Sequence, residues 1–251
     1  SSMAAHRANC FASSYFGATA AMRVAPSFPC AITTFLQLLK TVMEPAGLYG
    51  CELWGMLSVK GIFSASWSLD KFYSLDDPLE QKRCCLLRRW LKLPQSTPKL
   101  CMLHELGREP LVHEYVRRAV RFYNALVSLP EDCVYKGVLK QNVEDAFAGH
   151  SATRRVALNF TSALHRALKV LVPSERGMVS KMRALELFDP VEIDAALAVR
   201  YREHIVQLSR VHRGEGAKSG VYFREVARHA MGEIPRYYSL HLSHGLLVRF
   251  L

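Results

Sequence analysis

Apolar residues recur at three- and four-residue intervals along residues 77–94, and this spacing predicts an amphipathic helix. Asp77, Pro78 and Glu80 together are typical of a helix start. Pro94 ends the segment, because proline has no backbone N–H to donate. The apolar side of this helix consists of Leu79, Leu86, Leu87, Trp90 and Leu91. The opposite side carries Lys82, Arg88, Arg89 and Lys92.

A turn at 95–98, a short apolar segment and a helix-interrupting stretch at 107–110 follow this first helix. A second amphipathic helix is predicted over about residues 111–129. Its apolar stripe consists of Val112, Tyr115, Val116, Ala119, Phe122, Tyr123 and Leu126. A different line along the same helix carries His113, Arg117 and Arg121, with Arg118 beside them. Each of the two helices therefore combines an apolar face with a cationic face.

The rest of the chain also has mainly helical spacing. Helices are expected from about Phe35 toward Pro45, over residues 143–147 and 152–172, and after the cap at 189–190. No stretch alternates apolar and polar residues for long enough to predict a strand of a sizeable sheet. We therefore predict a mainly α fold, an irregular multi-helix bundle with little or no β-sheet. Residues 1–212 would form one helical region, and 213–251 a C-terminal helical segment after a glycine-rich linker.

Composition and charge narrow the class of protein. Half of the 251 residues are hydrophobic, which excludes a chain that is disordered throughout. The net charge is +11, of which residues 61–130 and 201–251 contribute +4 each, and this excess favours an anionic partner. Basic faces on two neighbouring helices would form a strip that suits a phosphate backbone. The alternative is that the same side chains only solvate the outside of a helical bundle.

If the strip exists, Trp90 and Tyr115 would belong mostly to the core, and arginine and lysine would contact the phosphates. Such contacts position a protein on nucleic acid without specifying a sequence. The expected phosphate-binding side chains are Arg88, Arg89, Lys92, Arg117, Arg118 and Arg121.

Five short sequences follow one another within residues 44–130. They are LYGCELWG at 48–55, LEQ at 79–81, LRR at 87–89, LPQSTP at 93–98 and ELGREPL at 105–111. In this order and at these separations, the set resembles the thumb-like region that follows the palm in reverse transcriptases of non-LTR (LINE-type) retrotransposons. A fainter resemblance covers residues 222–251. The chain departs from the family at Lys92, where a glycine is common, and at Lys82-Arg83, where an apolar residue and Gln are usual.

The resemblance implies a non-catalytic C-terminal piece of an RNA-directed DNA polymerase, whose palm carboxylates would lie N-terminal to this chain. The implied partners are the backbone of RNA, DNA or an RNA–DNA hybrid and the remainder of the polymerase chain. The piece would be no enzyme on its own and would hold no cofactor and no metal. The competing interpretation is a helical interaction or scaffold protein, derived from a retroelement remnant, without nucleic-acid binding.

Two motifs with the appearance of catalytic or phosphate-binding chemistry do not fit their templates. Residues 73–77 (YSLDD) are similar to the aromatic-x-Asp-Asp turn that holds metal ions in reverse transcriptases, but the aromatic residue is one position too far away. Asp77 is moreover already expected to be a helix cap. Residues 214–219 (GEGAKS) fail as a phosphate loop, because Ala217 precedes the lysine and the segment follows a helix.

Isolated polar residues give only weak indications of catalysis or metal binding. Glu52 is expected to anchor the backbone as a buried hydrogen-bond acceptor, because no second carboxylate lies at a spacing that suits catalysis. His241 and His244 could share a metal ion, but no cysteine follows Cys133 to complete a site.

The remaining features concern location. Seven cysteines without a Cys-x-x-Cys pair indicate reduced thiols in a cytoplasmic or nuclear protein. Residues 1–43 contain no acidic residue, which also fits an organellar transit peptide, so an organellar location is the alternative. No run is long and apolar enough to predict a membrane span.

Overall fold

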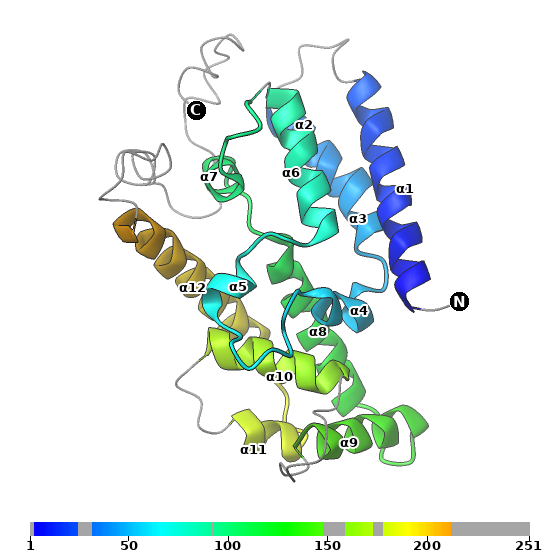
Figure 1. The fold of residues 1–251 in the computed structure, drawn as a ribbon. Helices are drawn as coiled ribbons and strands as arrows, with labels where there is room; N and C mark the ends of the chain where they lie inside the picture. The colour runs from blue at the N-terminus through cyan, green and yellow to red at the C-terminus, as the bar shows by residue number, and fades with distance from the viewer. Residues whose placement is uncertain (1–2, 25–31, 92, 148–158, 173–177, 212–251) are drawn as a thin grey trace. The chain divides into compact units, whose positions relative to one another are not determined.

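The computed structural model describes residues 3–24, 32–91, 93–147, 159–172 and 178–211 (Figure 1). These residues are mainly helical, and no strand occurs among them. The prediction of a mainly α, multi-helix fold with little or no β-sheet is therefore confirmed. The C-terminal segment predicted at 213–251 and its linker lie outside the described residues, so that domain boundary stays a prediction.

The fold divides into two compact units that interleave along the chain. Unit 1 takes its described residues from Ser1–Tyr49, Leu75–Pro110 and Ile205–Leu251. Its helices are α1 (Met3–Val24), α2 (Ile32–Leu38), the π-helix η2 (Leu39–Met43), α3 (Glu44–Gly47), α6 (Pro78–Leu91) and α7 (Lys99–Glu105).

Unit 2 consists of Gly50–Ser74 and Leu111–His204. Its helices are α4 (Cys51–Ser58), α5 (Leu69–Phe72), α8 (Leu111–Val127), α9 (Val134–Phe147), α10 (Phe160–Leu171), α11 (Met178–Arg183) and α12 (Pro190–Val211) as far as His204. The α8 helix begins at the predicted residue and ends two residues before the predicted end, and α9 begins earlier than its apolar spacing indicated.

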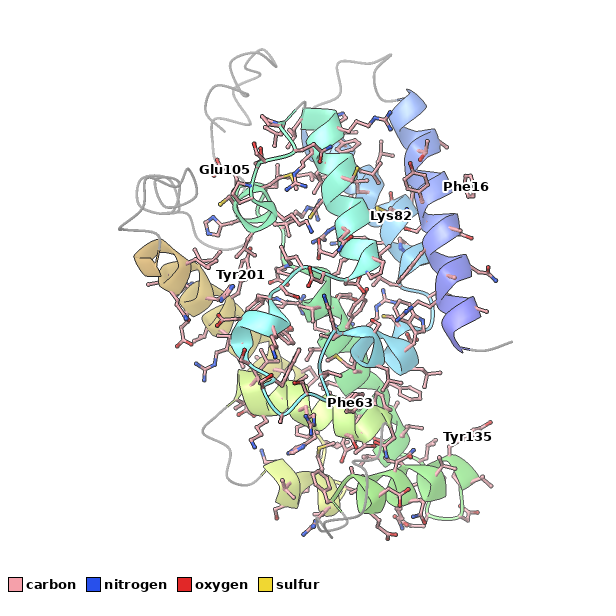
Figure 2. All side chains as sticks on the ribbon, viewed as in Figure 1. Phe16, Phe63, Lys82, Glu105, Tyr135 and Tyr201 are labelled. Atoms are coloured by element: carbon pink, nitrogen blue, oxygen red, sulfur yellow. The ribbon has the colours of Figure 1, made fainter. Side chains whose placement is uncertain are left out.

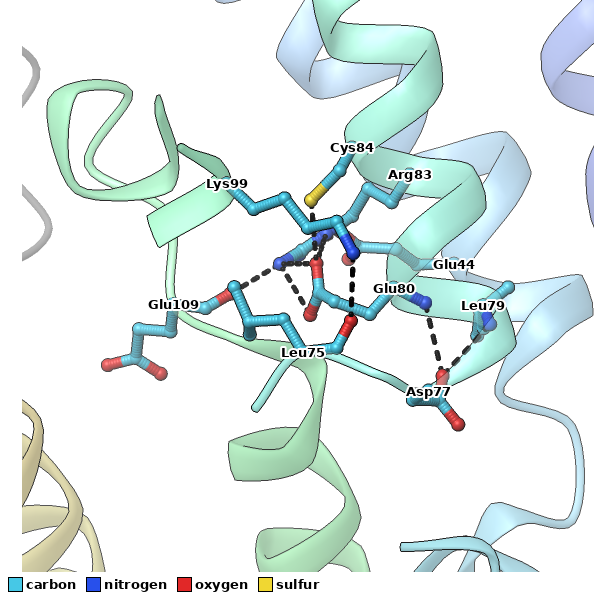
Figure 3. Close-up of polar contacts among 9 residues, drawn as sticks. All are labelled: Glu44, Leu75, Asp77, Leu79, Glu80, Arg83, Cys84, Lys99 and Glu109. Atoms are coloured by element: carbon cyan, nitrogen blue, oxygen red, sulfur yellow. Dashed lines mark hydrogen bonds and ion pairs between the residues drawn. The ribbon is translucent and has the colours of Figure 1, made fainter. Parts of the chain in front are cut away.

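The α6 helix begins where its sequence predicts. One carboxylate oxygen of Asp77 accepts hydrogen bonds from the backbone N–H groups of Leu79, at 2.9 Å, and Glu80, at 3.1 Å (Figure 3). These bonds satisfy donors that the first turn of a helix leaves open. Asp77 is therefore a helix cap, as expected.

A buried arginine connects separate segments of unit 1. The Arg83 side chain is 5% exposed, and its Nε and Nη2 donate to the two carboxylate oxygens of Glu80 at 2.9 and 3.1 Å. Its Nη1 lies 3.4 Å from a carboxylate oxygen of Glu44, and Nη2 also donates to the carbonyl of Glu109 at 2.6 Å (Figure 3). The network joins α3, α6 and the loop residue Glu109, which precedes Pro110.

Around this network, unit 1 has an apolar core. Trp90 lies flat against the buried ring of Phe35, with ring centroids 4.4 Å apart and planes 4° from parallel. The fully or nearly fully buried members of this core include Phe35, Leu36, Leu39, Met43, Leu48, Leu79, Leu87, Leu91, Met102 and Leu103. The apolar side predicted for α6 is thus the side that packs inward.

In unit 2, α4 and α8 approach closely because a glycine stands at their contact. A Cβ built on Gly55 would lie 3.0 Å from Cγ and 3.1 Å from Cδ1 of Tyr115, whose side chain is fully buried. The ring of Trp54 meets Tyr115 edge-on at 5.7 Å. Close packing of the two helices therefore depends on the absence of a side chain at position 55.

Two polar side chains attach loops of unit 2 to helices. Asn124 on α8 donates to the carbonyl of Phe188 at 2.7 Å and accepts from its N–H at 3.0 Å. Arg166 on α10 donates to the carbonyls of Ile62 and Ser64, at 3.2 and 3.0 Å. The loop over residues 59–68 is held in this way.

Substitution of Gly55 by Ala should destabilise the protein by about 1–3 kcal/mol, because the added methyl group overpacks the contact with Tyr115. Gly137→Ala is the matched control, since a Cβ at this position in α9 would have no atom within 4 Å. It should stabilise by up to about 1 kcal/mol through helix propensity. Urea unfolding measures both changes, and a loss of stability shared by the two variants would contradict the assigned contact.

Candidate nucleic-acid interface

The predicted phosphate-binding residues divide between the two units. Arg88 and Arg89 lie in the last turns of α6 in unit 1. Arg117, Arg118 and Arg121 lie on α8 in unit 2. Lys92 lies outside the described residues. Because each unit is described by itself, a continuous strip across α6 and α8 stays a prediction, and each set is considered within its own unit.

Two consecutive arginines of α6 have different environments. Arg88 is half-buried, and its Nη2 donates to the carbonyl of Thr97, which fastens the turn after α6 to the helix. Arg89 is exposed. Arg88 therefore already has a structural contact, while Arg89 presents its guanidinium to solvent.

The arginines of α8 show the same division. Arg117 Nε lies 2.6 Å from a carboxylate oxygen of Asp194 on α12, and Arg118 Nε lies 2.8 Å from one of Glu114, one turn earlier on α8. Both side chains are partly exposed, so each ion pair adds little stability. Arg121, one turn further along, is exposed.

His113, which the sequence placed on the same line as Arg117 and Arg121, is fully buried. Its Nε2 lies 3.0 Å from the hydroxyl of Tyr73. The cationic line of α8 therefore begins at Arg117, and the spacing alone could not reveal this, because a histidine fits a buried face as well as an exposed one.

His113 belongs to a buried cluster of rings, here called the Tyr73 cluster. The Tyr73 ring stacks on that of His204 at 4.9 Å, and Tyr201 lies 5.6 Å from Tyr73 and 5.7 Å from His113. Nδ1 of His204 lies 3.4 Å from a carboxylate oxygen of Asp70. The aromatic residue of the YSLDD motif is thus part of the core of unit 2.

The other candidates from the sequence are Glu52, a metal site and the motif at 214–219. One carboxylate oxygen of Glu52 is buried without a hydrogen-bond partner within the described ranges, so its predicted anchoring role stays a prediction. No group of three His, Cys, Asp or Glu side chains suited to a metal ion occurs in the described part of the chain. His241 and His244 and the motif at 214–219 lie outside it. Among the helices that the structure describes, none is long and apolar enough to cross a bilayer.

Residues that the sequence analysis passed over lie on the outside of unit 1. Phe16 on α1 is 72% exposed and Tyr15 is 37% exposed, and the ammonium of Lys82 lies 4.4 Å from the centroid of the Tyr15 ring. The available signal was the absence of acidic residues from positions 1–43, which composition showed but which did not point to particular side chains.

No protein-family model matches the chain. No curated protein and no solved structure matches it either.

Replacement of Arg88 by Met should lower the free energy of unfolding by about 1–3 kcal/mol, because the charged hydrogen bond to the Thr97 carbonyl is lost at a half-buried site. Arg89→Met, the matched control one residue further on, should change it by less than about 0.5 kcal/mol, since the side chain is exposed. Urea unfolding distinguishes the two, and equal effects would contradict the division of roles.

Acid should destabilise unit 2 through His204. Burial lowers the pKa of His204 and outweighs the attraction of the Asp70 carboxylate. As the pH falls below about 6.5, the unfolded chain takes up a proton that the folded chain does not bind, so the free energy of unfolding falls. His165, whose pKa is also lowered by burial and by Lys169 and Arg166, acts in the same direction.

The measurement is the unfolding free energy of the wild type and of His204→Gln between about pH 7.5 and about pH 5.5. The variant should lose less stability on acidification than the wild type does, whatever its absolute stability. An unchanged dependence on pH would show that His204 is not one of the responsible groups.

Proposed function

We propose that this chain is a non-catalytic C-terminal part of a retrotransposon-type RNA-directed DNA polymerase, and that it grips nucleic acid by the phosphate backbone. The observation that carries the proposal is the ordered set of five short sequences between residues 48 and 111, which resembles the region after the palm in non-LTR reverse transcriptases. The net charge of +11 supports an anionic partner. The catalytic carboxylates would belong to a palm outside this chain.

The environments of the arginines rank them as phosphate ligands. A phosphate at Arg88, Arg117 or Arg118 has to compete with a carbonyl or carboxylate oxygen that is already bound. Arg89 and Arg121 are exposed. In this proposal Arg89 and Arg121 make the principal phosphate contacts, and Lys92, Arg88, Arg117 and Arg118 add to them.

The second candidate function is a helical interaction or scaffold protein without nucleic-acid binding. The observation that favours it is that Arg88, Arg117 and Arg118 all contact other groups of the fold, as arginines of an ordinary protein surface do. In that case the chain should not bind nucleic acid even at low salt, where backbone contacts are strongest.

The test is a binding titration of the full chain with an RNA–DNA hybrid and a DNA duplex over a range of salt concentrations. The double variant Arg89→Glu/Arg121→Glu should weaken binding by about 10-fold or more at low salt. The slope of log affinity against log salt should become less steep by about 2, because two phosphate contacts are lost.

The matched control is Lys169→Glu/Arg202→Glu, which reverses two exposed cations on α10 and α12 and changes the net charge equally. It should leave the slope close to that of the wild type. An equal effect of both double variants would assign binding to overall charge instead of to Arg89 and Arg121. A wild-type chain that does not bind at low salt would refute the proposal.

A further inference from the structure

Two adjacent aromatic residues of α1 project in different directions. The Tyr15 ring lies under the ammonium of Lys82 on α6, with 4.4 Å between the nitrogen and the ring centroid. This geometry is a cation–π contact, and it holds the ammonium at the seam between the two helices. Phe16 projects away from the neighbouring helices, with 72% of its surface exposed (Figure 2). An uncovered phenyl ring therefore stands next in sequence to the tyrosine that holds the Lys82 ammonium.

A second cation continues the line of Lys82 along α6. Residues three and seven positions apart lie on the same side of a helix, so Lys82, Cys85 and Arg89 share one side. Arg89 is exposed and lies about 10 Å beyond Lys82 along the helix axis. The side of α6 that begins at the contact with Tyr15 is therefore cationic over two helical turns.

No exposed carboxylate of α1 or α6 opposes these charges. Residues 1–43 contain neither Asp nor Glu. The one acidic residue within α6, Glu80, is 2% exposed and bound to Arg83. An anion that approaches this surface therefore meets attraction from Lys82 and Arg89 without repulsion from either helix.

We propose that the surface formed by Tyr15, Phe16, Lys82 and Arg89, here called the α1–α6 surface, binds single-stranded nucleic acid. Phe16 stacks on an unpaired base, and Lys82 and Arg89 contact phosphates. Proteins that bind single strands combine an aromatic platform with a cationic track in this way. The inference rests on the proposed function and adds that unpaired strand is preferred here, because the bases of a duplex are already stacked on one another.

A lipid surface would also attract cations and aromatic rings, but α1 is a poor interfacial helix. Its outward-facing neighbours of Phe16 are small or polar and exposed: Ala5, Asn9, Ala12, Ser13 and Ala20. A helix that lies on a bilayer needs a continuous large apolar face. One phenyl ring among small residues suits a single base better than it suits a membrane.

The experiment compares Phe16→Ala with the wild type in the full chain. Fluorescence anisotropy measures binding to a labelled oligouridine of about 16 nucleotides and to a DNA duplex of the same length. Phe16→Ala should weaken single-strand binding by about 10-fold and leave duplex binding and the salt slope unchanged, since no charge is removed. Tyr135→Ala on α9, where the ring is 70% exposed, is the matched control and should change neither.

The outcomes separate this inference from the proposed function. Unchanged single-strand binding by Phe16→Ala overturns the inference, and the proposed function then stands or falls on Arg89 and Arg121 alone. An equal loss on single strand and duplex also overturns it, because stacking on an unpaired base predicts a difference. Co-sedimentation with phosphatidylcholine–phosphatidylserine vesicles that Phe16→Ala abolishes would identify a membrane contact instead. A wild type that binds neither nucleic acid refutes both proposals.

Discussion

The guanidinium of Arg83 is buried in unit 1, so its positive charge needs oxygen partners within the fold. The segments that supply these partners are held together by that requirement. Arg83 reaches Glu80 on its own helix, Glu44 on α3 and the carbonyl of Glu109, so three separate parts of the chain meet at one side chain. Removal of one partner from such a buried pair typically lowers the free energy of unfolding by about 3–5 kcal/mol, because the remaining charge is buried without a partner and without water. The same network sets the rotation of α6. With Arg83 turned inward, the side that carries Lys82 and Arg89 faces outward.

The arginines of this chain fall into two groups, those that contact other groups of the fold and those whose side chains are exposed. Arg88, Arg117 and Arg166 are bound to oxygen atoms of the protein and hold turns and helices in place. Arg89 and Arg121 have exposed side chains, although their sequence neighbourhoods are similar. A count of positive charges on a helix therefore overestimates its capacity for phosphate. The number of guanidinium groups without a prior contact is the better guide.

Local signals in the sequence were sufficient for α8 and for the starts of α6 and α12, but not for α1, which no periodicity predicted, or for the start of α9. The Asp77 cap of α6 and the Asp189 cap of α12 each depend on residues within a few positions, and both are found as predicted. Most of the predicted apolar stripe of α8 is buried, whereas Phe122 and Leu126 are only partly buried. Burial of Arg83 and His113 was not predictable in this way, because their partners Glu44, Glu109 and Tyr73 lie 26 to 40 positions away. For the candidate site, the sequence indicated the cations but not which of them the fold already uses. Phe16 was not predicted, because the adjacent Tyr15 and Phe16 stand among alanines and serines without a helical periodicity.

The way in which Arg166 holds the loop before α5 affects how that loop can evolve. Its guanidinium contacts the carbonyls of Ile62 and Ser64, and every amino acid carries a carbonyl. The attachment itself therefore does not depend on the side chain at position 64, whereas Ile62 is also fixed by its own burial, with 1% of its surface exposed. Variation at the exposed positions of this loop, Ala65 and Ser66, should be tolerated, whereas a change of Arg166 removes two of the hydrogen bonds that hold the loop. Sensitivity to substitution is thus shared by the arginine that holds the loop and by the loop's own buried Ile62, and tolerance is confined to the exposed positions between the loop's contacts.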